Sequence, residues 1–151
     1  MPKLLDEWLN EPDTPLEKQR TVNKAQVQGW LKEAVRKYED AKRSANSEST
    51  RMDAAYDATF FCALAALATQ AVRVTSRPRH HVVALEAAAA LMALPATLVD
   101  EADALREWRN RKYQGFFSAT ERDVQDAIDT AKRYLEATSL WLQQNEPHLL
   151  K

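Results

Sequence analysis

Apolar side chains recur at intervals of three and four residues along most of this chain, which is the spacing of an α-helix that buries one face. In residues 23–44, Val27, Trp30, Leu31, Ala34 and Tyr38 form such a stripe, and lysines and arginines lie opposite. Similar patterns run through residues 51–70, 80–94 and 97–113, and from residue 120 to about 142. With 2 glycines and no valine-rich alternation, the chain lacks the signals of a sheet. The pattern predicts an all-α, single-domain antiparallel bundle of about five helices.

Polar or helix-breaking residues separate these segments. A run of residues that compete for backbone hydrogen bonds fills positions 44–50, and Pro78 interrupts the chain before the third helix. Pro95 ends the third helix or opens the fourth, and Gly115 is placed to adopt a left-handed conformation after the fourth. Asn23 is the expected cap of the first long helix, and Ser118 or Thr120 that of the last. Residues 51–70 are apolar on nearly all sides, so we expect this helix at the centre.

The two ends of the chain fall outside the bundle, which we assign to residues 23–145. Residues 1–22 form an N-terminal arm with a short helix over residues 4–10, and residues 11–15 of this arm lie on the bundle or on a second subunit. Residues 146–151 form a C-terminal tail that we expect to fray, with His148 in it.

Composition limits the classes of function. The chain carries 21 basic and 22 acidic residues, a net charge of -1, so any nucleic-acid site must be a local patch. Cys62 lies in an apolar run and has no cysteine to pair with, which favours a buried, inert thiol and a cytoplasmic location. Asp6 and Glu7 argue against a secretory signal, and no apolar segment reaches the roughly 20 residues of a membrane span.

The local patch is the C-terminal end of the helix over residues 97–113. Its candidate ligand-binding residues are Arg106, Arg109, Asn110, Arg111 and Lys112, followed by Tyr113 and Gln114. Arg106, Arg109, Asn110 and Tyr113 share one helix face, whereas Gln114 lies about 140 degrees around the axis from Arg109. A guanidinium binds phosphate oxygens in pairs, so this face predicts a phosphate site. Two other interpretations stay open: a dimer contact without a ligand, or a solvated charge run.

A second basic segment precedes the third helix and holds Arg77, Arg79, His80 and His81. These residues extend the phosphate-binding surface, or one histidine reaches Arg109 as a catalytic base. Neither histidine has partners at metal-ligand spacing, so we expect no metal and no cofactor. Asp53 or Asp57 is a candidate ion-pair partner for Arg109.

Three features together resemble the HEPN domain superfamily. Arg109-Asn110 is similar to its Arg-Asn-x-x-x-His motif, with Gln114 at the position of the histidine. The start of the second long helix at residues 53–61 and the Arg-Pro-Arg-His-His sequence at residues 77–81 are similar as well. The resemblance spans about residues 23–144.

The resemblance implies an all-α homodimer in which the Arg-Asn segments of two subunits face each other. Many members are metal-independent ribonucleases of toxin and defence systems, often next to a nucleotidyltransferase, and others bind RNA or nucleotides without cleaving them. By position, Arg109 contacts the scissile phosphate and Asn110 orients it. Gln114 cannot titrate near neutral pH, and Tyr113, with an ordinary pKa near 10, is a poor base. Phe116 stands where some toxins carry a tyrosine that the nucleotidyltransferase modifies.

We therefore predict a homodimer that binds RNA or a nucleotide phosphate through Arg109 and Asn110, with catalysis weak or absent. A toxin–antitoxin or defence system with a nucleotidyltransferase-type partner is its expected setting. One alternative is an active ribonuclease that uses Arg109 with Tyr113, His80 or His81. Another is a helical interaction module that holds a partner through Trp8, Trp30 or Trp141.

Overall fold

The computed structural model describes residues 3–116 and 118–151; Met1 and Pro2 of the predicted arm, and Phe117, lie outside it. The described residues form six α-helices, two short strands and a terminal 3-10 helix: α1 (Leu5–Leu9), β1 (Leu16–Lys18), α2 (Lys24–Lys42), α3 (Glu48–Ala68), β2 (Val72–Val74), α4 (His80–Met92), α5 (Ala96–Tyr113), α6 (Glu121–Asn145) and η1 (Pro147–Leu150). The all-α prediction is confirmed.

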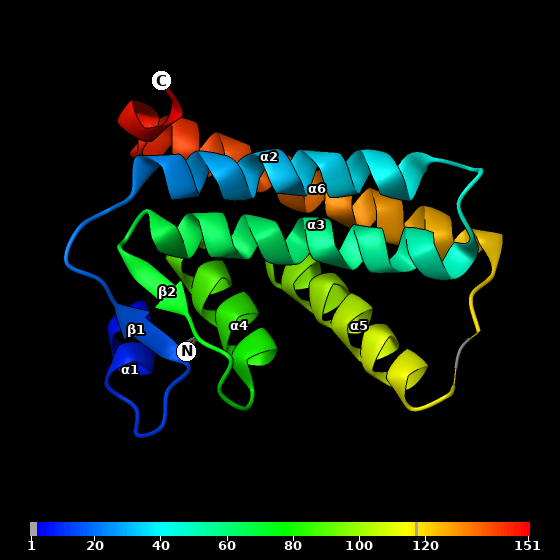
Figure 1. Cartoon of the computed structure of the whole chain (residues 1–151), viewed down its shortest axis with the longest axis horizontal. Helices are drawn as coiled ribbons and strands as arrows, with labels where there is room; N and C mark the ends of the chain where they lie inside the picture. Colours follow the sequence, from blue (N-terminus) through cyan, green and yellow to red (C-terminus); the bar gives the residue numbers. More distant parts are fainter. Residues whose placement is uncertain (1–2, 117) are drawn as a thin grey trace.

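Helix α3 lies at the centre of the bundle, as its apolar composition predicts. It contacts α2, α4, α5 and α6, and Figure 1 shows α2 along one side of it with α4 and α5 on the other. The faces of α3 that meet these helices carry small side chains, and Ala55, Ala58, Ala63 and Ala66 are fully buried. Small residues let the helix axes approach closely, so α3 positions its neighbours rigidly.

Helices α2, α5 and α6 begin where the polar signals place them, whereas α3 begins at Glu48, inside the link predicted over residues 44–50, because the Ser47 side chain caps it by accepting from the Thr50 N–H. The side chain of Asn23 accepts a hydrogen bond from the backbone N–H of Gln26, and α2 follows it. Thr120 caps α6, and its side chain and that of Asp123 bond each other's backbone N–H groups. Pro95 occupies the cap position of α5, so it opens that helix.

Two strands were not predicted, and they correct the expectation of a sheet-free chain. Strand β1 pairs with β2 in antiparallel orientation, with Leu16 opposite Val74 and Lys18 opposite Val72. Each strand has three residues, so neither can show a period-two pattern in the sequence. The pair ties the N-terminal arm to the segment that leads into α4, and α1 also packs on α4.

The C-terminal tail is ordered, contrary to the expected fraying. Its last turn is η1, and Leu149 is buried against Val27 and Ala68. Gln28 donates hydrogen bonds to the backbone oxygens of Leu149 at 3.0 Å and Lys151 at 3.2 Å. His148 itself stays exposed. Within the part of the chain that the structure describes, no helix combines the length and apolar character needed to cross a bilayer.

Candidate functional site

Arg109 lies near the C-terminal end of α5, between two aromatic rings. Its guanidinium carbon is 4.9 Å from the centre of the Tyr113 ring and 5.8 Å from the centre of the Tyr56 ring. Tyr56 comes from α3 and is buried, whereas Tyr113 is 68% exposed. A cation over an aromatic face is attracted by the negative charge of that face. Rings from two helices therefore hold the Arg109 guanidinium at the surface of the bundle.

Arg109 has no carboxylate partner among the described residues, in contrast to Arg106 and Lys112 on the same helix. Arg106 Nε donates to Asp103 Oδ1 at 2.8 Å, and Lys112 forms an ion pair with Asp53. The predicted ion pair of Arg109 with Asp53 or Asp57 is wrong, since Lys112 occupies Asp53 and Asp57 makes no ion pair among the described residues. The charge of Arg109 is therefore available to an external anion.

Asp57 lies close to Arg109 but forms no ion pair with it. Burial raises the pKa of Asp57, while the charges of Lys37, Arg109 and Lys112 act in the opposite direction. Asp53 and Asp57, together with Lys37, line a neighbouring polar hollow of about 320 Å³. The negative charge of Asp53 neutralises Lys112, whereas Arg109 interacts with Asp57 only at longer range and forms no ion pair among the described residues.

His81 approaches the same place from α4. Its Nδ1 lies 2.7 Å from the hydroxyl oxygen of Tyr56, and its ring lies 4.5 Å from the Phe60 ring, centre to centre. Burial and the charges of His80, Arg109 and Arg106 lower the pKa of His81 to about 4, so its imidazole is neutral at pH 7. Tyr56 on α3, His81 on α4 and Arg109 on α5 thus form one three-helix cluster, which we call the Tyr56 cluster.

The second half of the predicted motif does not join the Tyr56 cluster. Gln114 caps the C-terminal end of α5, is exposed, and uses its backbone N–H for bonds to the oxygens of Asn110 and Arg111. Asn110 and Arg111 are exposed as well. Gly115 follows with φ of +87°, the predicted left-handed conformation that ends the helix. The helix therefore stops before Gln114 can turn toward Arg109.

The residues of the second basic segment, Arg77 to His81, contact two different parts of the molecule: the N-terminal arm and the Tyr56 cluster. Arg77 donates to the backbone oxygen of Thr14 at 3.3 Å, and Arg79 is exposed in a left-handed conformation at the start of α4. His80 Nδ1 is 3.0 Å from the Arg77 oxygen, and its ring lies 4.3 Å from that of His81. Of these four residues, the structure brings His81 into the Tyr56 cluster and places His80 beside it.

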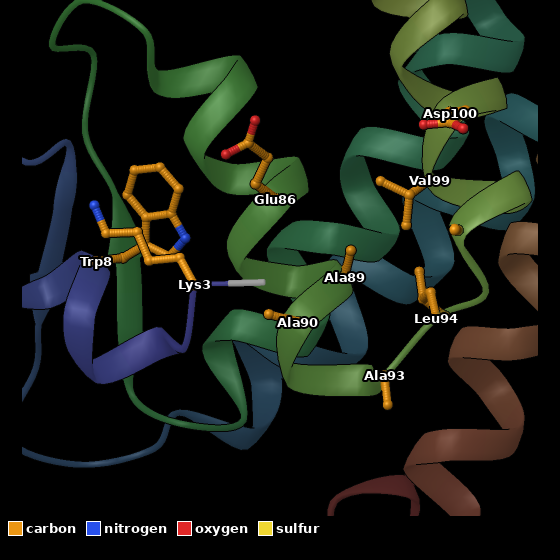
Figure 2. Close-up of a pocket in the computed structure, with 10 residues that line it drawn as sticks. Lys3, Trp8, Glu86, Ala89, Ala90, Ala93, Leu94, Val99 and Asp100 are labelled. Atoms are coloured by element: carbon orange, nitrogen blue, oxygen red, sulfur yellow. The ribbon is translucent and has the colours of Figure 1, made fainter. Parts of the chain in front are cut away.

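Two further hollows hold candidate residues: Arg77 and Arg79 line one of about 380 Å³ beside residues 11–15, and Arg111 lines one of about 330 Å³. A hollow of about 460 Å³ between α1, α4 and α5 holds none of them, with Trp8 and Ala90 on its walls and Glu86 and Asp100 at its edge (Figure 2). Trp8 is 5% exposed and Trp30 stacks on Phe61, so both indoles serve packing within the chain. Trp141 also packs against the core, which disfavours the interaction-module interpretation. Across residues 3–116 and 118–151, no cluster of three or more His, Cys, Asp or Glu side chains is arranged to hold a metal ion.

The sequence analysis did not identify the pair formed by Tyr56 and His81. Tyr56 and His81 are 25 residues apart and lie on different helices, so no local spacing links them. The same holds for the pair of Asp53 and Lys112, which are 59 residues apart. The sequence does show a histidine at the start of α4 and a tyrosine in the middle of α3. That the two side chains meet follows only from the way these helices pack.

A family model described as HEPN domain matches residues 27–141, from the second turn of α2 to the last turns of α6. The matched segment contains Tyr56, His81 and Arg109. No curated protein and no solved structure matches the chain significantly.

Proposed function

The chain belongs to the HEPN domain family, and we propose that it binds the phosphate of a nucleotide unit, in RNA or in a free nucleotide, through Arg109. The observation that carries this proposal is a part-buried arginine, fixed by two aromatic rings, without a carboxylate partner among the described residues. Charge-assisted hydrogen bonds from a guanidinium to phosphate oxygens are among the strong polar interactions in proteins. The exposed ring of Tyr113 beside it offers a surface on which a base stacks.

Catalysis is weak or absent in this proposal. Cleavage of RNA without a metal needs a group that takes the proton of the 2′-hydroxyl, and such general acid–base help contributes about 10²- to 10⁴-fold. Gln114 has no titratable group, and it is separated from Arg109 by the end of α5. Arg106 and Asn110, which share the helix face of Arg109, supply further hydrogen-bond donors around the bound phosphate, whereas Arg111 lines a different hollow with Trp108 and Asp126.

The test compares two charge-removing substitutions of the same type. Arg109→Ala removes the proposed site, whereas Arg36→Ala removes an exposed arginine on α2 that pairs with Glu33. Affinity is measured by fluorescence anisotropy for a labelled single-stranded RNA and, in a separate series, for a labelled adenine nucleotide. We expect Arg109→Ala to lose at least about ten-fold in affinity with an unchanged thermal midpoint, and Arg36→Ala to bind normally. Equal affinity of Arg109→Ala and wild type contradicts the proposal, and the two probes distinguish RNA from a nucleotide.

The homodimer is part of the same proposal. Phe116 is 73% exposed after the end of α5, and a second copy would cover such a ring. Sedimentation equilibrium of wild type and of Phe116→Ser measures the association, and we expect the variant to associate more weakly. A toxin–antitoxin or defence locus with a nucleotidyltransferase-type partner remains the proposed setting.

An active metal-independent ribonuclease is the second candidate. The observation that favours it is the position of His81 in the Tyr56 cluster, because an imidazole near Arg109 is the type of group that Gln114 replaces. RNA that stays intact during incubation with an excess of protein in EDTA excludes this candidate. Cleavage that disappears in Arg109→Ala supports it.

A further inference from the structure

The Tyr56 hydroxyl is a buried group with one described partner. Tyr56 is 1% exposed, and His81 Nδ1 is its hydrogen-bond partner within the described residues. Burial holds the pKa of Tyr56 above its usual value, so the phenol keeps its proton. A buried hydroxyl proton without an acceptor costs free energy. The favoured arrangement therefore has the Tyr56 O–H donating and His81 Nδ1 accepting.

This hydrogen bond decides where His81 carries its own proton. A neutral imidazole has one N–H, so when Nδ1 accepts a hydrogen bond the proton sits on Nε2. None of the described residues offers Nε2 a hydrogen bond, and Nε2 is not among the buried polar atoms that lack a partner. The two nitrogens flank one ring carbon and their hydrogen-bonding directions diverge widely, so the bond to the buried Tyr56 directs Nε2–H away from that hydroxyl.

The surroundings of His81 fix the ring in this orientation. The rings of Phe60 and His80 lie 4.5 and 4.3 Å from it, and Tyr56 contacts its edge. The ionisable groups that act on it are Arg106 and Arg109 from α5 and His80 from α4. Two cations close by disfavour a third charge, so His81 stays neutral and still presents a donor.

From this geometry we infer that His81 binds the phosphate as a neutral hydrogen-bond donor through Nε2–H, alongside Arg109, and that Tyr56 is the positioning residue that selects this tautomer. The inference rests on the proposed function, since it names a second group for the same phosphate. It also gives His81 a role other than that of a base. With Nδ1 engaged and Nε2 protonated, the ring has no lone pair to accept the 2′-hydroxyl proton.

The tautomer is measured in the protein without any ligand. Long-range proton–nitrogen correlation spectra of ¹⁵N-labelled protein distinguish Nε2–H, Nδ1–H and doubly protonated histidine. We expect His81 to show the Nε2–H form between pH 5.5 and 8, and the Tyr56→Phe variant to show a mixture of tautomers. The exposed His148 serves as an internal reference. An Nδ1–H or doubly protonated His81 at pH 7 overturns the inference.

Binding of the labelled single-stranded RNA tests the role of the donor. His81→Gln keeps an N–H donor and is expected to bind within about three-fold of wild type, whereas His81→Leu is expected to lose about ten-fold. His148→Leu is the control, because it makes the same substitution at an exposed histidine in the C-terminal tail, outside the Tyr56 cluster. Wild-type affinity in His81→Leu, with loss of binding in Arg109→Ala, overturns this inference alone. A wild-type protein that binds neither the RNA nor the nucleotide overturns the proposed function and this inference together.

Discussion

Two tyrosines of this bundle are equally buried and differ in what their hydroxyls meet. Tyr56 on α3 and Tyr134 on α6 are each 1% exposed, and burial raises the pKa of both above the ordinary range. The Tyr56 hydroxyl bonds His81, whereas the Tyr134 hydroxyl has no hydrogen-bond partner among the described residues. The difference shows two uses of one side chain: Tyr134 fills volume near Cys62, and Tyr56 connects the core to a polar group at the surface.

The largest expected effect is the loss of the Tyr134 ring. Tyr134→Ala leaves a cavity between α3 and α6, and removal of a buried aromatic ring costs about 3–5 kcal/mol of unfolding free energy. Urea denaturation of wild type and variant measures this cost. A cost below about 1 kcal/mol would contradict the interpretation of Tyr134 as a packing residue.

A smaller effect concerns the pH dependence that His81 gives to stability. Its pKa is about 4 in the folded chain and near 6.5 when unfolded, so the unfolded chain binds the proton first and stability falls as the pH drops from about 6.5 to 4. Solvent screening of the half-buried ring reduces the contribution to about 1–2 kcal/mol. Urea midpoints at pH 7 and 4.5 should differ more for wild type than for His81→Gln. Identical differences in the two proteins would show that His81 is not desolvated.

The smallest effect is removal of the Tyr134 hydroxyl. Tyr134→Phe keeps the ring and removes a buried polar group without a partner, so we expect a gain of about 1 kcal/mol in unfolding free energy. RNA affinity should not change, in contrast to the binding losses expected at the Tyr56 cluster. A clear destabilisation in thermal and urea unfolding would mean that the Tyr134 hydroxyl is hydrogen-bonded after all, and the contrast between the two tyrosines would disappear.

The helices could be predicted because their signals are local. The five long helices have an apolar face over three or more turns, and α2, α3 and α6 also have a capping side chain, from Asn23, Ser47 and Thr120, so neighbouring residues largely determine their type and start. The strands could not be predicted, since three-residue elements carry no period of their own. Their pairing depends on contacts between residues far apart in the chain.

In the candidate site, too, the features with local signals could be predicted and those that depend on helix packing could not. Arg109 stands out in the sequence because its helix face is basic and aromatic, and its place near the end of α5 follows from Gly115. The neighbours that matter most could not be read from the sequence. The approach of His81 to Tyr56 depends on how α4 crosses α3, and the pairing of Lys112 with Asp53 removes a partner that Arg109 was expected to have.

The strand pair links the beginning of the chain to the entry of α4 at little cost in loop entropy. At this junction the Lys18 side chain donates a hydrogen bond to the backbone oxygen of Gln70, 52 residues further along the chain. Closing a flexible loop of that length would carry a large entropy cost. Helices α2 and α3 run side by side in opposite directions, so their packing already brings the two ends together (Figure 1). The effective loop then shrinks to about eight linker residues, and the closure entropy falls by about 2 kcal/mol. The strand pair also anchors the segment that leads into α4 and His81. Its stability therefore depends on the packing of α2 against α3.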